Sequence, residues 1–322
     1  MLLQVRDLRT YFDTEDGVVK AVDGISFELS KGKTLGIVGE SGCGKSVTAM
    51  SLLRLLPSPP ARHASGEILF EGEDLLVKDA EAMRSVRGRE LAVIFQEPMT
   101  SLNPVYTVGF QIAEAIQNHF PEKDPESVKA RVLELLDRVG IADAADRFDN
   151  YPHQLSGGMR QRIMIAMALA CDPKLLIADE PTTALDVTIQ AQILELMTKL
   201  KNETGMSVIL ITHDMGVIAE MVDEVIVMYA GKIVERASVD DLFAHPLHPY
   251  SRGLLASIPS MQKRGERLNT IPGQVPPLTK LPVGCAFQDR CPLVQPHCRE
   301  QDPVLERKAE GHWASCFEVK AL

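Results

Sequence analysis

The chain has 322 residues, of which 45% are hydrophobic and 24% charged, a composition typical of a globular protein and not of a disordered one. Lysine and arginine number 34 against 44 aspartates and glutamates, so the formal net charge of −10 gives no general electrostatic reason to bind nucleic acid. The length predicts one large domain with an appendage.

The N-terminal residues MLLQVRDLRTYF carry charge early and lack the apolar core of a signal peptide. No segment approaches the roughly 18 uninterrupted apolar residues of a membrane span. We therefore expect a cytosolic protein, whose role at a membrane, if it has one, depends on a partner.

The first 35 residues alternate between apolar and polar in strand fashion, with turns at Asp16-Gly17 and Lys31-Gly32. An apolar run from Leu35 to Val38 enters a glycine-rich turn. A helix is then predicted from Val47 to Leu56, where the prolines that begin at Pro57 stop it.

Residues 105–150 are predicted to form amphipathic helices, for example 128–139. Strands are predicted at 174–179, 207–212 and 224–229, separated by helical patterns, which indicates a mostly parallel sheet covered by helices. After about residue 260 the composition changes. The four prolines between Ile271 and Pro282 predict a stiff connector into a small cysteine-bearing appendage.

The glycine-rich turn fits the phosphate-loop pattern G-x-x-x-x-G-K-[ST]. Its glycines let backbone N–H groups surround phosphate oxygens, and the helix that follows favours negative charge at its N-terminus. Lys45 would reach the β and γ phosphates of a nucleotide, and the Ser46 hydroxyl would hold Mg²⁺. The predicted nucleotide-binding residues in this motif are Gly39, Ser41, Gly42, Cys43, Gly44, Lys45 and Ser46.

A buried strand, Leu175 to Ala178, ends in two acidic residues. Ligands of such sheets bind outside the carboxyl ends of the strands. Asp179 is predicted to hold Mg²⁺, and Glu180 to polarise the attacking water as general base.

The sequence Leu155-Ser156-Gly157-Gly158 precedes a predicted helix and separates this chain from other phosphate-loop ATPases. With the two motifs above, it resembles the ABC ATPase family over residues 1–260. The resemblance implies an α/β fold with a phosphate-loop NTPase core, an N-terminal antiparallel β-subdomain and a helical subdomain inserted at about 100–165. It also implies that Ser156, Gly157 and Gly158 serve the γ-phosphate bound by the opposite subunit.

Four further positions match family elements. Phe12 matches the aromatic residue that stacks on adenine, with Tyr11 as the alternative if the register differs by one. Gln96 matches an amide that contacts Mg²⁺ and the catalytic water. Asp186 lies in the segment that resembles the one crossing the dimer interface. His213 ends a strand and matches the histidine that hydrogen-bonds the γ-phosphate.

Two stretches, Leu247–Leu255 and Pro181–Gln190, are similar to the ATPases of oligopeptide, dipeptide and nickel importers. This resemblance implies a second, related ATPase subunit (or a second copy), two transmembrane permeases and an extracytoplasmic peptide-binding protein. It places the chain peripherally at the cytoplasmic face of the inner membrane. The alternatives are an ABC ATPase acting on nucleic acid or the ribosome, a regulatory protein that senses metal, and an importer of nickel or another small solute.

Residues 261–322 are predicted to form a separate C-terminal domain with cysteines spaced C-x5-C-x6-C-x17-C. This spacing is looser than that of zinc ribbons and favours a 4Fe–4S cluster on Cys285, Cys291, Cys298 and Cys316, as similar tails in the importer group also suggest. Zinc and unligated thiols are the alternatives, and His297 and His312 complicate the ligand count. Cys43 and Cys171 are predicted to be packing residues.

Overall fold

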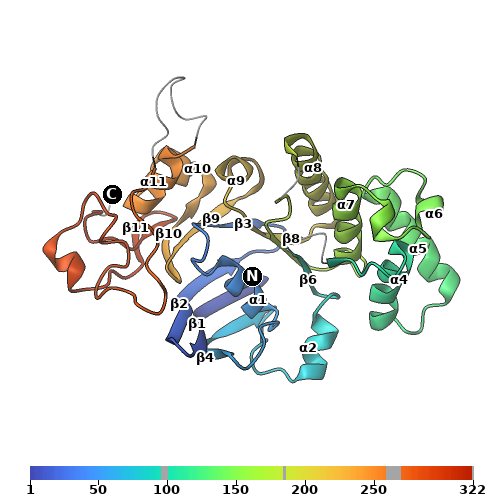
Figure 1. Ribbon diagram of the computed structural model, residues 1–322, viewed down its shortest axis with the longest axis horizontal. Coiled ribbons are helices and arrows are strands. Elements are labelled where there is room, and N and C mark those ends of the chain that lie inside the picture. Colours follow the sequence, from blue (N-terminus) through green and yellow to red (C-terminus); the bar gives the residue numbers. More distant parts are fainter. Residues whose placement is uncertain (96–100, 184–185, 259–269, 321–322) are drawn as a thin grey trace. The chain divides into compact units, whose positions relative to one another are not determined.

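The computed structural model describes residues 1–95, 101–183, 186–258 and 270–320 (Figure 1). Two compact units emerge, one made of Met1–Val77 with Ile211–Leu322 and the other of Lys78–Leu210.

The first unit begins with an antiparallel sheet in the order β2-β1-β4-β5. Its strands are β1 (Leu3–Thr14), β2 (Gly17–Leu29), β4 (Ala61–Phe70) and β5 (Glu73–Asp74). The alternation read from the sequence places Leu3, Val5 and Leu8 in the core, each at most 1% exposed. The expected N-terminal antiparallel subdomain is confirmed, although β4 and β5 were not predicted.

The same unit carries the strand order β11-β12-β10-β9-β3. Here β3 (Thr34–Val38) and β9 (Glu224–Tyr229) are parallel, and β10 (Lys232–Ser238) returns antiparallel to β9. Two strands of the C-terminal segment, β11 (Glu306–Ala309) and β12 (His312–Ala314), extend this sheet through β10. The cysteine-bearing segment is therefore joined by strand pairing to the sheet that contains β3.

The helices of the first unit are α1 (Lys45–Leu52), α9 (Met215–Met221), α10 (Val239–Ala244), α11 (Pro249–Ala256) and the 3-10 helix η3 (Pro296–Arg299). The prediction that the first helix extends to Leu56 was wrong. It ends at Leu52 because Arg54 adopts a left-handed φ of +51° and cannot continue the helix.

In the second unit the strand order is β8-β7-β6, from β6 (Leu91–Ile94), β7 (Leu175–Asp179) and β8 (Ser207–Ile211), with β6 and β7 parallel. Every residue of β7 and β8 is buried, as the apolar runs predict. The helices are α2 (Ala80–Val86), α4 (Val108–His119), α5 (Pro125–Arg138), α6 (Ala144–Arg147), η1 (Pro152–Gln154), α7 (Gly157–Ala168) and α8 (Val187–Thr204).

Candidate nucleotide site

The phosphate loop lies between the end of β3 at Val38 and the start of α1 at Lys45. Two of its glycines have no room for a side chain. A Cβ at Gly39 would lie 2.3 Å from the Met228 carbonyl oxygen, and one at Gly44 would lie 2.2 Å from the Ala21 carbonyl oxygen. Gly44 also has a φ of +106°, which L residues rarely adopt. The loop conformation therefore requires glycine at these two positions.

The Lys45 side chain curls back over the loop that precedes it. Its Nζ donates to the carbonyl oxygens of Gly39, at 2.8 Å, and Glu40, at 3.1 Å, and the residue is 6% exposed. Ser46, the next residue of α1, is exposed. Both of these acceptors are neutral carbonyls, and an ammonium forms stronger, charge-assisted hydrogen bonds with phosphate oxygens.

His213 lies near the same loop. A cavity of about 250 Å³ is lined by Val38, Gly39 and Glu40 from the loop, by residues 213–216 at the start of α9, and by residues 254, 257 and 258 at the end of α11. Asp214 caps α9 by accepting from the Gly216 N–H at 2.8 Å, which fixes the turn that carries His213. The structure thus places His213 and the phosphate loop on one cavity of the first unit.

The two predicted acidic residues end β7 in the second unit. Asp179 is 3% exposed, and a Mg²⁺ bound here would compensate the charge of a carboxylate this buried. Glu180 adopts a left-handed φ of +47°, uncommon outside glycine, so its side chain leaves the strand in a new direction. The Thr183 hydroxyl donates to Glu180 Oε2 at 2.9 Å and orients the carboxylate.

The signature residues form the N-terminus of α7. Ser156 is its N-cap and accepts from the Met159 N–H at 3.3 Å, and exposed Gly157 begins the helix. Gly158 faces α8, because a Cβ there would lie 3.0 Å from Ile189 Cγ2. This is a helix terminus with an exposed hydroxyl and backbone N–H groups, the arrangement that binds anions.

Gln161, for which the sequence motifs predict no role, joins this helix to the end of the acidic strand. It is fully buried, and its Nε2 donates to the Pro181 carbonyl at 2.5 Å, just beyond Glu180. The signature helix and the segment of the expected general base are thus directly bonded. The only sequence signal for this role of Gln161 was its position in the predicted helix, one turn after the two glycines.

Asp186 caps α8 by accepting from the Ile189 N–H at 2.9 Å. Its carboxylate therefore already has a structural role. Gln96 lies outside the described residues, as do 184 and 185 beside Asp186, so the prediction for Gln96 stays a prediction.

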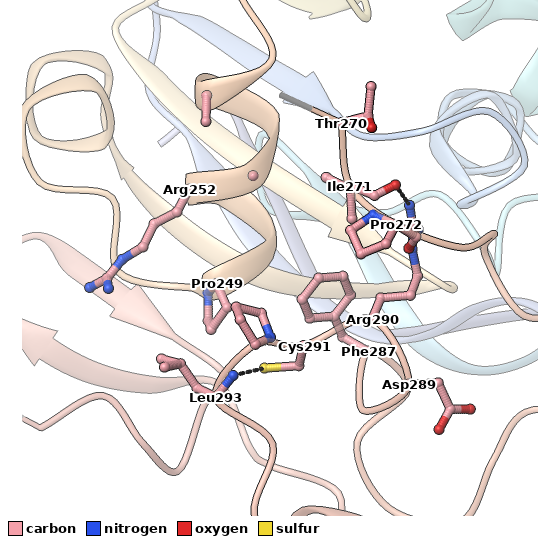
Figure 2. Close-up of a pocket in the computed structure, with 13 residues that line it drawn as sticks. Pro249, Arg252, Thr270, Ile271, Pro272, Phe287, Asp289, Arg290, Cys291 and Leu293 are labelled. Carbon is pink, nitrogen blue, oxygen red and sulfur yellow. Dashed lines mark hydrogen bonds between the residues drawn. The ribbon is translucent and has the colours of Figure 1, made fainter. Parts of the chain in front are cut away.

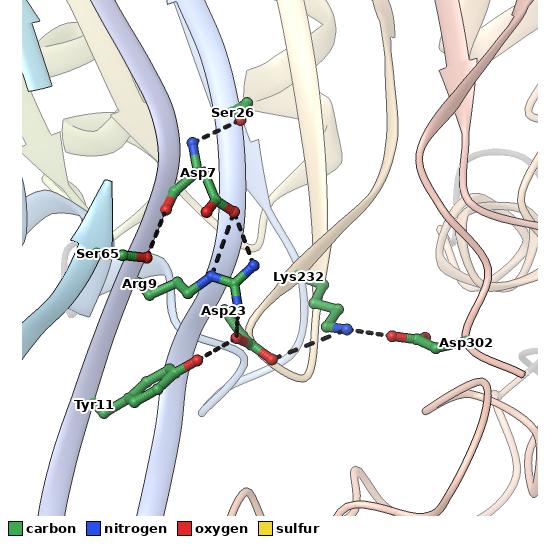
Figure 3. Close-up of polar contacts among 8 residues, drawn as sticks. All are labelled: Asp7, Arg9, Tyr11, Asp23, Ser26, Ser65, Lys232 and Asp302. Atoms are coloured by element: carbon green, nitrogen blue, oxygen red, sulfur yellow. Dashed lines mark hydrogen bonds and ion pairs between the residues drawn. The ribbon is translucent and has the colours of Figure 1, made fainter. Parts of the chain in front are cut away.

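Tyr11 and Phe12 differ in how their side chains are engaged. The Tyr11 hydroxyl donates to Asp23 Oδ1 at 2.5 Å, and Arg9 and Lys232 also approach the Asp23 carboxylate, at 3.7 and 4.0 Å (Figure 3). The Tyr11 ring lies beneath the cations of Lys20 and Arg62. Because Tyr11 is committed to this network, the geometry favours Phe12 for stacking on adenine.

All four tail cysteines line one small cavity, together with Phe287 and with Pro249 at the start of α11. Burial raises the pKa of the Cys285 thiol to about 11 and raises the pKa values of Cys291 and Cys316 as well. Thiols held this way need a cation to ionise them, as metal ligation does.

The two histidines of the tail have other partners. His312 Nε2 lies 2.7 Å from Glu235 Oε1, in a pair that is almost wholly buried. His297 pairs with Glu318 at 3.0 Å, and together with Cys298 these two form a group whose ligand atoms lie within 4.8 Å of one another. Among the described residues, this group contains one of the four cysteines, so the all-thiolate site stays a prediction.

Comparison with known proteins agrees with this geometry. The family described as "ABC transporter" matches residues 22–183, half of the chain. A probable peptide ABC transporter ATP-binding protein from Sinorhizobium fredii is 57% identical over 98% of this chain and 95% of that protein.

This chain belongs to the ABC transporter ATPase family.

A second match places it within the family. The oligopeptide/dipeptide transporter C-terminal region matches residues 234–298 of this ABC ATPase. The oligopeptide transport ATP-binding protein OppD of Bacillus subtilis is 52% identical over 98% of this chain and 88% of that protein. The comparisons give no support to the alternatives of a nucleic-acid or ribosomal ATPase.

Solved structures agree on the fold. A bacterial ABC transporter cassette solved as a dimer superposes with a TM-score of 0.66 at 25% identity, covering 74% of this ABC ATPase and 99% of that chain. In the described part of this ABC ATPase, no helix is both long and apolar enough to cross a membrane.

Proposed function

We propose that this ABC ATPase hydrolyses ATP to drive peptide uptake through partner permeases. The observation that carries the proposal is a folded phosphate loop, with Lys45 buried inside it and His213 on the same cavity, in a chain that matches the peptide-transporter C-terminal region. The peptide cargo rests on the names of the relatives.

In the proposed mechanism, Lys45 and the loop N–H groups bind the phosphates of ATP, and Phe12 stacks on adenine. Glu180, oriented by Thr183, takes the proton of the attacking water, and His213 holds the γ-phosphate. Mg²⁺ held by Ser46 and Asp179, with Gln96 alongside, would neutralise phosphate charge. Such transfer needs mainly positioning and charge neutralisation, which these residues supply.

The site is proposed to be complete only when two subunits meet. Ser156 and Gly157, at the N-terminus of α7, are exposed. They would bind the γ-phosphate of a nucleotide held by the opposite subunit, a related ATPase or a second copy. ATP would close the pair, and loss of the γ-phosphate would let it open.

An exposed aromatic pair in the second unit is a suitable docking surface for the permeases. Tyr106 and Phe110 stack with ring centroids 4.9 Å apart and are 47% and 45% exposed, and neighbouring Val105 is 69% exposed. Apolar side chains gathered on a surface mark interaction sites. Two transmembrane permeases and an extracytoplasmic peptide-binding protein complete the proposed complex, which holds this chain at the cytoplasmic face of the inner membrane.

The four tail cysteines are proposed to hold a 4Fe–4S cluster, with zinc as the alternative. Their convergence on one cavity, and the engagement of His312 by Glu235, suit an all-thiolate ligand set. Iron and sulfide in stoichiometric amounts, with broad visible absorption, would support the cluster. A colourless protein that contains zinc would refute it.

Reconstitution tests the proposed function. Purified chain, partner ATPase and permeases are placed in lipid vesicles with the peptide-binding protein inside and ATP outside. We expect ATP hydrolysis to increase when peptides are present and to fall to background in Glu180→Gln. Stimulation by nickel alone, or by nucleic acid without permeases, would contradict the proposal.

A further inference from the structure

Arg290, in the cysteine-bearing segment, contacts the phosphate loop directly. Its Nη1 and Nη2 pair with the two carboxylate oxygens of Glu40 at 2.5 and 2.8 Å. The arginine side chain is only 4% exposed, and that of Glu40 is 31% exposed. A two-pronged pair of this kind is among the most directional ion pairs in proteins. The second residue of the phosphate loop is thus held from a position 250 residues away.

Arg290 is itself anchored on several sides. Its Nε donates to the Pro272 carbonyl at 2.9 Å, and its guanidinium lies over the rings of Tyr229 and Phe287 at 5.8 and 5.9 Å. Figure 2 shows Arg290 reaching toward Ile271 and Pro272 at the edge of a cavity of about 560 Å³. These contacts hold the guanidinium in the orientation that faces Glu40.

The backbone of Glu40 is held by the same region. Its N–H donates to the hydroxyl of Tyr250 at 2.8 Å, and Tyr250 packs against Phe287 with ring centroids 5.5 Å apart. The carbonyl of Glu40 in turn accepts from Lys45 Nζ. Arg290 and Tyr250 are thus connected through Glu40 to Lys45, the residue expected to bind phosphate.

The ion pair between Arg290 and Glu40 also changes the electrostatics of the phosphate loop. A carboxylate within the phosphate loop repels a bound triphosphate, and the repulsion is strong where water is partly excluded. The guanidinium of Arg290 offsets that charge. Without it, the Glu40 carboxylate would be an uncompensated anion within the phosphate loop.

The segment from Cys285 to Cys291 links this contact to the thiol cavity. Both of its terminal cysteines line that cavity, and Phe287 and Arg290 lie between them. Cys285 also donates its N–H to the Cys298 carbonyl at 2.8 Å. A metal group bound by the thiols would fix both ends of the segment, and so the orientation of Arg290.

We propose that Arg290 is a positioning residue for the phosphate loop, and that filling the four-cysteine site tightens ATP binding by holding Arg290 against Glu40. The second half rests on the proposed metal group, whereas the first half does not.

The first half is tested by the affinity of the full chain for a non-hydrolysable ATP analogue. Arg290→Met is expected to weaken binding about tenfold, the size expected for one unpaired charge beside phosphate. The double variant Glu40→Gln/Arg290→Met should recover to within about threefold of wild type, and Arg290→Lys should recover part of the loss. Arg299→Met is the matched control and should bind normally; it removes an exposed arginine of the C-terminal region that pairs with Asp289 and donates to Gln288 rather than to Glu40.

Equal affinities of Arg290→Met and Arg299→Met would overturn the positioning role. A double variant as weak as Arg290→Met would also overturn it, because the loss would then not pass through Glu40. Circular dichroism melting of each variant separates a loss of affinity from a loss of fold.

The second half is tested by the same titration on protein loaded with iron and sulfide and on metal-free protein. Wild type should bind the analogue at least about threefold more tightly when loaded, and the double variant should show no difference. No difference in wild type, or an equal difference in the double variant, would overturn the coupling. Failure of the thiols to take iron or zinc would refute the proposed metal group and the coupling with it, and would leave the Arg290 measurement unaffected.

Discussion

His248 connects acidity to the stability of the segment that holds the phosphate loop. It is 2% exposed and caps α11, its Nδ1 accepting from the Tyr250 N–H at 3.0 Å. Burial lowers its pKa to about 4, with the Arg252 cation as a smaller cause in the same direction, while Glu235 and a hydrogen bond to the Ser315 backbone act the other way.

The sign and size of the effect follow from that pKa. An unfolded histidine titrates near 6.5, so between that value and about 4 the unfolded chain binds a proton that the folded chain does not. Stability is therefore intact at pH 7 and falls as the pH is lowered. At pH 5, about 1.5 pH units below the unfolded value, the loss is about 2 kcal/mol, since one unit corresponds to about 1.4 kcal/mol.

The test compares melting temperatures at pH 7 and pH 5 for wild type, His248→Asn and His245→Asn. Asparagine at 248 keeps the N-cap acceptor and removes the titration, and His245 is an exposed histidine three residues away. The acid-induced drop should be smaller by about 4 °C in His248→Asn than in the other two proteins. If the melting temperatures of all three proteins drop equally, the claim that His248 stays neutral in the folded protein is refuted.

Three further predictions concern the nucleotide site. Glu180→Gln should keep ATP affinity within about twofold while slowing hydrolysis about 10²–10⁴-fold, as loss of a general base does, and single-turnover assays would show whether another residue takes the proton. Lys45→Met should weaken ATP binding at least about tenfold by calorimetry, because the charge-assisted contacts to phosphate are lost, and unchanged affinity would contradict the assignment. Gly44→Ala should abolish ATP binding and lower the melting temperature, since its Cβ would lie 2.2 Å from a backbone oxygen. Gly42→Ala, at φ +79° with nothing within 4 Å of its Cβ, should be milder, and equal effects would argue against the steric reason.

The phosphate loop, the acidic strand end and the signature helix were all located from sequence because each depends on neighbouring residues. A buried strand, a glycine turn and a helix start are local patterns, and β3, α1, β7 and α7 lie where those patterns put them. The end of α1 was misplaced because the left-handed turn at Arg54 has no sequence signal as strong as the prolines that follow it.

Contacts between distant segments could not be predicted. Arg290 reads as an ordinary charged residue before a cysteine, and only the fold places it against Glu40. The pairing of β12 with β10, and the burial of His312 against Glu235, likewise depend on a C-terminal segment folding back onto the sheet. His312, counted from sequence among possible metal ligands, is engaged with a carboxylate instead.

The shared nucleotide site can be tested most directly with an ATP analogue that carries a photoreactive group on its γ-phosphate. Complexes are assembled from one intact ATPase subunit and one subunit of this chain with Lys45→Met, which is expected to bind its own nucleotide much more weakly. We predict that mass spectrometry will find the label on residues 155–160 of the Lys45→Met subunit, and that Ser156→Ala lowers its yield. Label confined to the subunit that binds the nucleotide would contradict a site shared between two chains.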